Sequence, residues 1–174
     1  MFTVSATRGL PVVVVCDTKG KVMRYIMWMV LLVFVSGCSV SFTTHDEDRA
    51  AQLVEKLLND IQSSNGIKSA YEWTHEKFKE TVSPDDFNKV VSNIRDFNSG
   101  AIIRIVGYET IGTEEFILIH AISDKGDKKI YYRFTLLGTK FKDYGLLNIN
   151  LRDHPFQVRG LYKEFGKPLE VSGL

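Results

Sequence analysis

The chain has 174 residues, 44% of them hydrophobic and 25% charged, which is ordinary for a globular protein with room for one domain. The net charge of +1 argues against a nucleic-acid-binding protein, because such proteins concentrate a basic excess on one face. Four of the 22 basic residues and one of the 21 acidic residues precede Cys38, which leaves 18 against 20 and a net charge of −2 from that cysteine onward.

An uncharged apolar run covers residues 25–37, with the sequence YIMWMVLLVFVSG. Its 13 residues are too few for a membrane-spanning helix, which needs roughly 20. Lys21 and Arg24 supply a positive flank before it, so the pattern favours a signal peptide. A buried core helix is the alternative, but it would be apolar on every side.

The run ends in Val35-Ser36-Gly37-Cys38, which resembles the lipobox of bacterial lipoprotein precursors. The resemblance implies cleavage before Cys38 and attachment of diacylglycerol and acyl chains to that residue, which together anchor a protein stably to a membrane. Ser39 resembles the residue that directs Gram-negative lipoproteins to the outer membrane, with the domain facing the periplasm. Since Cys16 would be removed with the signal, we expect neither a disulfide nor a thiolate metal or redox site.

The signal itself defines a domain plan. Residues 23–37 already form a complete short lipoprotein signal, so we interpret residues 1–22 as a start-site artefact or an extended leader. Residues 38–45 would be a lipidated tether, residues 46–151 an α+β domain, and residues 152–174 an irregular tail containing Pro155, Gly160, Gly166 and Pro168.

Three helices are predicted first in the domain. Asp46, Glu47 and Asp48 favour a helix start, and apolar residues at three- and four-residue spacing continue to Ile61. A second helix is expected over residues 67–81. Ser83 then provides an N-cap, Pro84 suits the first helical position, and residues 87–97 carry an apolar stripe that includes Val90 and Phe97.

After Gly100 the pattern favours strands. Residues 101–110, 114–122, 129–137 and 140–151 are rich in β-branched and aromatic side chains and are separated by turn residues, which predicts an antiparallel meander of four strands. Helices followed by such a sheet indicate an α+β fold. Residues 71–87 and the stretch Gly138-Thr139-Lys140-Phe141 resemble motifs of the NTF2-like and cystatin-like proteins. That resemblance implies three helices packed on a curved four-stranded sheet that forms a cone.

Some members of that group are enzymes with a polar group inside the cone, and the candidate here is His120 in an apolar strand. Burial would lower its pKa and let it act as a base, although a core histidine with one hydrogen bond is the plainer interpretation. His75 is a further possibility. Tyr108, Tyr131 and Tyr132 are more typical of sheet packing than of acid catalysis, and we find no Asp or Glu beside them whose spacing would complete a pair. The cone pocket would be lined by Tyr108, Phe116, Leu118, His120 and Tyr132.

Motifs of other enzyme classes are absent from the sequence: it contains no GxSxG, HExxH, P-loop or GxGxxG. The four histidines lack metal-ligand spacing, so neither a metal nor a cofactor is expected. Arg133, Arg152 and Arg159 could rim an anion pocket, but scattered arginines are ordinarily solvated.

We therefore predict a non-enzymatic envelope lipoprotein whose domain binds a small apolar ligand or a protein partner. The alternatives are an enzyme that uses His120 and a structural subunit of an envelope assembly.

Overall fold

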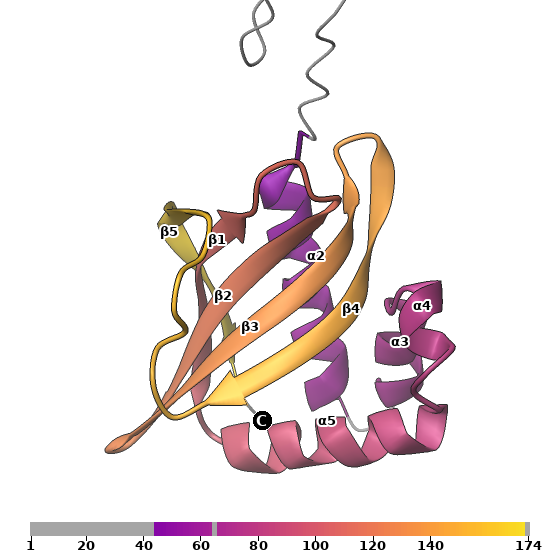
Figure 1. Cartoon of the computed structure of the whole chain (residues 1–174). Coiled ribbons are helices and arrows are strands. Elements are labelled where there is room, and N and C mark those ends of the chain that lie inside the picture. Colours follow the sequence, from indigo (N-terminus) through magenta and orange to yellow (C-terminus); the bar gives the residue numbers. More distant parts are fainter. Residues whose placement is uncertain (1–43, 64–65, 173–174) are drawn as a thin grey trace, which may run out of the picture. The chain divides into compact units, whose positions relative to one another are not determined.

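A computed structural model describes residues 44–63 and 66–172. The predictions made for residues 1–43, including the apolar run and Cys38, lie outside these described residues. Helices come first in the chain and strands follow (Figure 1). The elements in order are α2 (Glu47–Gln62), α3 (Ile67–Glu72), α4 (Glu76–Lys79), α5 (Pro84–Asn98), β1 (Ile102–Thr110), β2 (Phe116–Lys125), β3 (Lys128–Thr139), β4 (Lys142–Arg152) and β5 (Leu161–Ser172).

Helix α2 confirms the first predicted helix. The Asp46 side chain accepts a hydrogen bond from the Arg49 N–H at 3.0 Å, so it caps the helix, and Glu47 and Asp48 place negative charge in the first turn. One face of the helix is fully buried against the sheet; its apolar members are Ala50, Ala51, Val54, Leu57, Leu58 and Ile61.

The single helix predicted over residues 67–81 is instead two short helices, α3 and α4. Between them the chain extends and pairs with the edge of β4: the His75 N–H donates to the Leu146 carbonyl at 2.8 Å, and the Leu146 N–H donates to the Trp73 carbonyl at 2.9 Å. These two long-range bonds replace helical bonds that local preference would have formed, so the packing partner decides the break.

Helix α5 begins as predicted. The Ser83 hydroxyl accepts from the Asp86 N–H, and Pro84 occupies the first turn. The predicted inward face is correct for Phe87, Val91 and Ile94, but Val90 is 47% exposed. The last helical residue, Asn98, is buried and exchanges hydrogen bonds with the Tyr132 hydroxyl at 2.8 and 3.0 Å.

The sheet is antiparallel throughout, with the order β4-β3-β2-β1-β5. The predicted α+β class is confirmed, but the sheet has five strands and not four. β1 lies inside the sheet and pairs with β2 on one side and β5 on the other. The register shifts between Ile105 and Gly107 in both pairings: Val106 is a bulge against β2, whereas against β5 the extra residues, 165–168, lie on β5.

The prediction that residues 152–174 form an irregular tail was wrong, because most of this segment forms β5. Strand β1 presents a second row of backbone donors and acceptors, and β5 satisfies them. Gly166 and Pro168, which suggested irregular structure, fall where the register jumps from Glu164 to Leu169, so they interrupt the ladder without ending the strand. Val171 is buried in the core, and the α+β domain therefore continues to Ser172.

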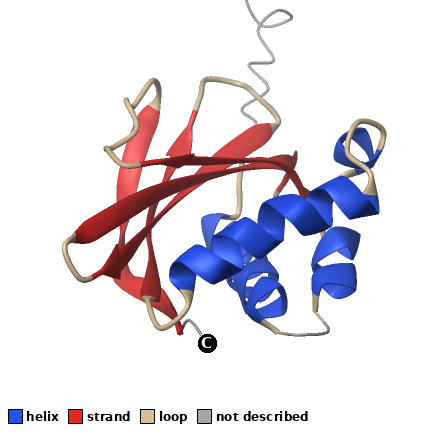
Figure 2. Cartoon of the chain, turned by 90° about the horizontal axis from the view of Figure 1, so that it is seen from below, coloured by secondary structure: helices blue, strands red, loops and turns tan. Residues whose placement is uncertain are grey.

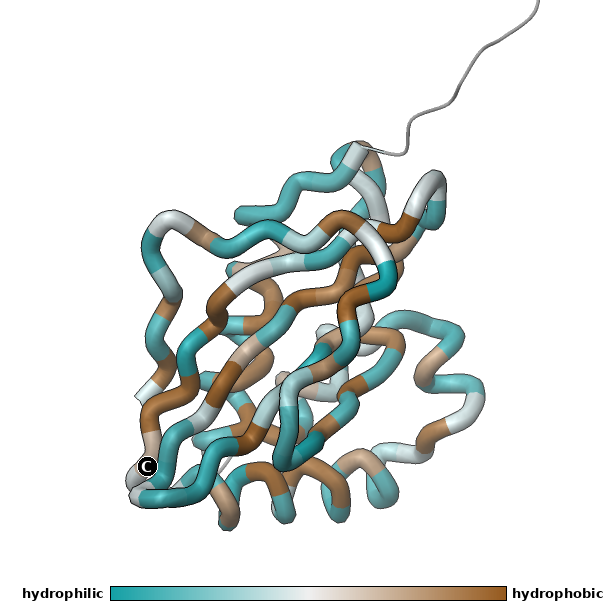
Figure 3. The backbone as a smooth tube through the Cα atoms, turned by 60° about the vertical axis from the view of Figure 1, so that its left-hand side comes forward, coloured by the Kyte–Doolittle hydropathy of each residue, from teal (hydrophilic) through white to brown (hydrophobic). Residues whose placement is uncertain are grey.

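The helices lie on one side of the curved sheet (Figure 2). Hydropathy alternates along the strands, so one face belongs to the core and the other is more polar (Figure 3). The core face is filled by large side chains without exposed surface, among them Tyr132, Phe134 and Leu136. The segment between β4 and β5 crosses the opposite face, which we call the outer face, and buries Phe156 there.

Candidate functional site

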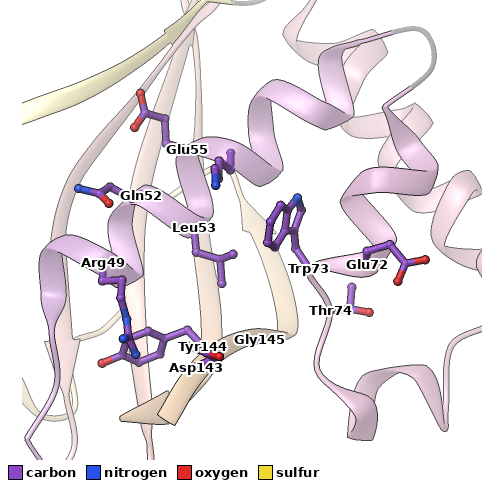
Figure 4. Close-up of a pocket in the computed structure, with 11 residues that line it drawn as sticks. Arg49, Gln52, Leu53, Glu55, Glu72, Trp73, Thr74, Asp143, Tyr144 and Gly145 are labelled. Atoms are coloured by element: carbon purple, nitrogen blue, oxygen red, sulfur yellow. The ribbon is translucent and has the colours of Figure 1, made fainter. Parts of the chain in front are cut away.

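A groove of about 620 Å³ opens between α2, the segment before α4 and the start of β4 (Figure 4). We call it the α2–β4 groove. Its lining comes from three places. Helix α2 contributes Arg49, Gln52, Leu53, Glu55 and Lys56. The end of α3 and the break after it contribute Glu72, Trp73 and Thr74, and β4 contributes Asp143, Tyr144 and Gly145.

The apolar part of the groove consists of Leu53, Trp73 and Tyr144, each half-buried. Their polar ends are fixed elsewhere. The Trp73 indole N–H donates to Asp60 Oδ2 at 2.9 Å, and the Tyr144 hydroxyl accepts from the Asp46 N–H at 2.8 Å. Because these hydrogen bonds already fix the two rings, a ligand that contacts them would lose little further side-chain entropy on binding.

The rim of the groove carries both signs of charge. Arg49 donates to the carbonyls of Thr139 and Lys142 at 3.1 and 2.7 Å, and its guanidinium lies 5.2 Å from the centre of the Tyr144 ring. The Lys56 ammonium lies 5.0 Å from the Trp73 ring. Carboxylates of Glu55, Glu72 and Asp143 complete the rim, so the groove does not select for one sign of charge.

The five residues predicted to line one pocket lie on two different faces of the sheet. Tyr108 and Tyr132 face the helices: Tyr108 donates to Glu47 Oε1 at 2.8 Å, and Tyr132 is bonded to Asn98. Burial raises the pKa of each tyrosine to about 12, so both stay protonated near neutral pH.

Phe116, Leu118 and His120 belong to the outer face, because Ile117, Ile119 and Ala121 between them lie in the core. His120 borders a cavity of about 220 Å³ beneath the β4–β5 segment, with the rings of Phe156 and Tyr162 edge-on to it. Its Nε2 lies 3.2 Å from Glu109 Oε2. Burial lowers the pKa of His120, and Glu109 opposes that effect.

Glu109 is the carboxylate that the sequence search missed. It has no exposed surface, and its Oε1 accepts from the N–H groups of Arg159 and Gly160 at 2.6 and 2.8 Å. Glu109 and His120 are diagonal neighbours on adjacent strands, because Glu109 of β1 lies opposite Leu118 of β2 and His120 follows two residues after Leu118. This pairing could have been found only from the register of the β1–β2 hairpin, not from the spacing of the two residues in the sequence. The other predicted histidine, His75, caps α4 through its ring nitrogen and takes no part in this site.

Comparison of the chain with family models, curated proteins and solved structures finds no match.

Within the described ranges, no group of three His, Cys, Asp or Glu side chains is arranged to hold a metal ion. No helix in this part of the chain is both long and apolar enough to cross a membrane.

Proposed function

We propose that this chain is an envelope lipoprotein, anchored through Cys38, whose domain binds an extended segment of a partner protein in the α2–β4 groove without catalysing a reaction. The lipobox-like sequence supports the anchor. The observation that carries the binding role is the groove itself, with two fixed aromatic rings above an aliphatic floor and a rim of mixed charge. The long helix α2 packed across a curved sheet is in keeping with the cystatin-like cone.

An extended peptide suits this groove because the β4 edge already accepts one. The chain's own Trp73–His75 segment hydrogen-bonds to both backbone groups of Leu146. Tyr144 lies two residues before Leu146 on the same edge strand, beside a register shift in the pairing of β4 with β3. A partner segment could therefore continue this pairing while its side chains contact Trp73 and Tyr144.

The anchor is tested by labelling cells with radioactive palmitate. The wild-type protein is expected to take up label and to fractionate with membranes, whereas Cys38→Ala is expected to do neither. Label that persists in Cys38→Ala would refute the lipoprotein proposal. Cys16→Ala is the matched control and should behave as the wild type.

The groove is tested with peptides selected from a random display library against the processed protein. After cleavage before Cys38, Trp73 is the single tryptophan, since the other of the two is Trp28. Its fluorescence therefore reports on the groove alone. Leu53→Glu should abolish the peptide-induced change, while Thr135→Glu on the outer face should retain it. Equal binding by Leu53→Glu would contradict a peptide site in the groove.

A second candidate function is a hydrolytic enzyme that uses His120 as its base. The specific observation in its favour is the Glu109 carboxylate, which orients the imidazole as carboxylates do in catalytic dyads. Under the binding proposal we expect no ester hydrolysis that depends on His120. Turnover of model esters that His120→Gln removes, with the fold intact, would favour the enzyme instead.

A further inference from the structure

The outer face brings two arginines onto one aromatic ring, with a third, Arg159, close enough for its charge to act on Arg133. The guanidinium carbons of Arg133 and Arg152 lie 4.5 and 5.0 Å from the centre of the Phe156 ring. Arg159 lies on the same segment as Phe156, and its backbone N–H is tied to Glu109. The three residues come from β3, from the end of β4 and from the segment that crosses the face, so only the fold places them side by side.

These three cations have little negative charge to balance them. In residues 44–63 and 66–172, none of the three forms an ion pair. Glu109 is the nearby buried anion, but its oxygens already accept two backbone N–H groups and face His120. Asp153, beside Arg152, is engaged by His154 at 2.7 Å. This local excess of positive charge contrasts with the net charge of −2 from Cys38 onward.

Arg133 also carries a donor without an acceptor. Its Nε is buried and has no hydrogen-bond partner within the described residues. A buried guanidinium donor left unpaired is costly, so such groups usually have a partner. Burial lowers the pKa of Arg133, Glu109 opposes this, and the charges of Arg159 and Arg152 add to the lowering. An anion placed here would relieve both the missing acceptor and the mutual repulsion.

We propose that Arg133, Arg152 and Arg159 form a binding site for a phosphate-type oxyanion on the outer face. A tetrahedral oxyanion offers several acceptors, and guanidinium groups bind such anions through paired N–H donors. Phe156 holds two of the guanidinium groups by cation–π contact and limits their rotation. The ligand is either a free phosphate or a phosphorylated headgroup. The site is on the opposite side of the sheet from the α2–β4 groove and does not depend on the function proposed for it.

The test uses the processed protein in detergent and follows arginine Nε–H signals by NMR while inorganic phosphate is added. We expect a saturable shift of the Arg133 signal that chloride at equal ionic strength does not produce. Arg152→Gln and Arg159→Gln should each weaken phosphate binding about tenfold, because each removes one charge-assisted contact. Arg104→Gln is the matched control. Because Arg104 is already paired with Asp124, this substitution should leave the phosphate affinity unchanged.

Glycerol phosphate serves as the second probe and distinguishes the sources. If glycerol phosphate binds more tightly than inorganic phosphate, the ligand of the site is a phosphorylated headgroup. If inorganic phosphate binds more tightly, the ligand is a free anion. Shifts that chloride reproduces, or equal affinity in the wild type and Arg152→Gln, would overturn the proposal. Phosphate should leave Trp73 fluorescence unchanged, so this result and the peptide result can fail separately.

Discussion

Glu109 has no exposed surface, and every contact it makes on the outer face holds another part of the chain. Two backbone N–H groups of the β4–β5 segment donate to it, and His120 lies against its other oxygen. The carboxylate therefore fixes the segment that carries Phe156. This structural role explains a Glu–His pair without requiring catalysis, since buried charges are kept only where hydrogen bonds satisfy them.

Two substitutions of Glu109 should show how much its hydrogen bonds to the β4–β5 segment stabilise the fold. Glu109→Ala leaves two buried N–H groups without an acceptor, and we expect the free energy of unfolding to fall by about 3 kcal/mol. Glu109→Gln keeps an oxygen for those groups and should cost about 1 kcal/mol. Urea unfolding measures both values. A loss in Glu109→Ala no larger than in Glu109→Gln would show that the segment is held by other contacts.

His120 should make stability depend on pH. Burial lowers its pKa in the folded protein below the ordinary value of 6.5, so the unfolded chain binds a proton more readily. The free energy of unfolding is therefore expected to fall as the pH drops from 6.5 toward the folded pKa. NMR titration should place the pKa of His120 below 6.5, and His120→Gln should remove this part of the slope. A midpoint above 6.5 would mean that Glu109 outweighs burial.

At the scale of elements, β5 completes the sheet. It supplies the second partner of β1 and places Val171, which is 1% exposed, against the core. The neighbouring Ser172 is exposed. Adjacent residues of a strand point to opposite faces, so the two positions offer a matched comparison.

Val171→Asp should unfold the domain or lower its stability by several kcal/mol, because it buries an unpaired charge. Ser172→Asp should change the stability by less than about 0.5 kcal/mol. Circular dichroism during thermal unfolding distinguishes the two results. Similar melting temperatures for both variants would mean that β5 contributes little to the core.

Local signals predicted the helix starts correctly. The caps at Asp46 and Ser83 depend on residues within three positions, and both are present. The break between α3 and α4 depends on Leu146, and β5 depends on the free side of β1, so neither could be seen in a short window of sequence. Composition around Pro168 suggested an irregular tail because proline disfavours strands, but the register jump accommodates it.

The candidate site was predicted less well for the same reason. His120 was identified, but its partner Glu109 requires the hairpin register. Leu53 appeared as one more member of the apolar stripe of α2, whereas the structure leaves it half-buried in the groove. Trp73 belongs to the stretch that resembles NTF2-like proteins, but nothing in the sequence marked it as a groove residue, because its position beside α2 follows from the pairing of the next residues with β4.

At the largest scale, one core joins the helices and the sheet in the part of the chain that the structure describes. The buried cluster includes Val54 of α2, Val91 of α5 and Val171 of β5. We therefore expect the domain to unfold in a single transition. Trp73 fluorescence and far-ultraviolet circular dichroism should give the same urea midpoint. Two separated midpoints would indicate that the region of α3 and α4 unfolds independently of the sheet.

The open edge of β5 bears on how copies of this protein behave when they are crowded. An unpaired edge strand can pair with the edge of a second copy and start aggregation. On this strand Pro168 offers no N–H donor, and the exposed Lys163 and Lys167 would bring like charges together in a symmetric pair. Under the proposed lipid anchor, copies of the protein would be concentrated on a membrane and would meet often. Pro168, which made β5 look irregular, therefore also helps to keep the sheet from growing between molecules.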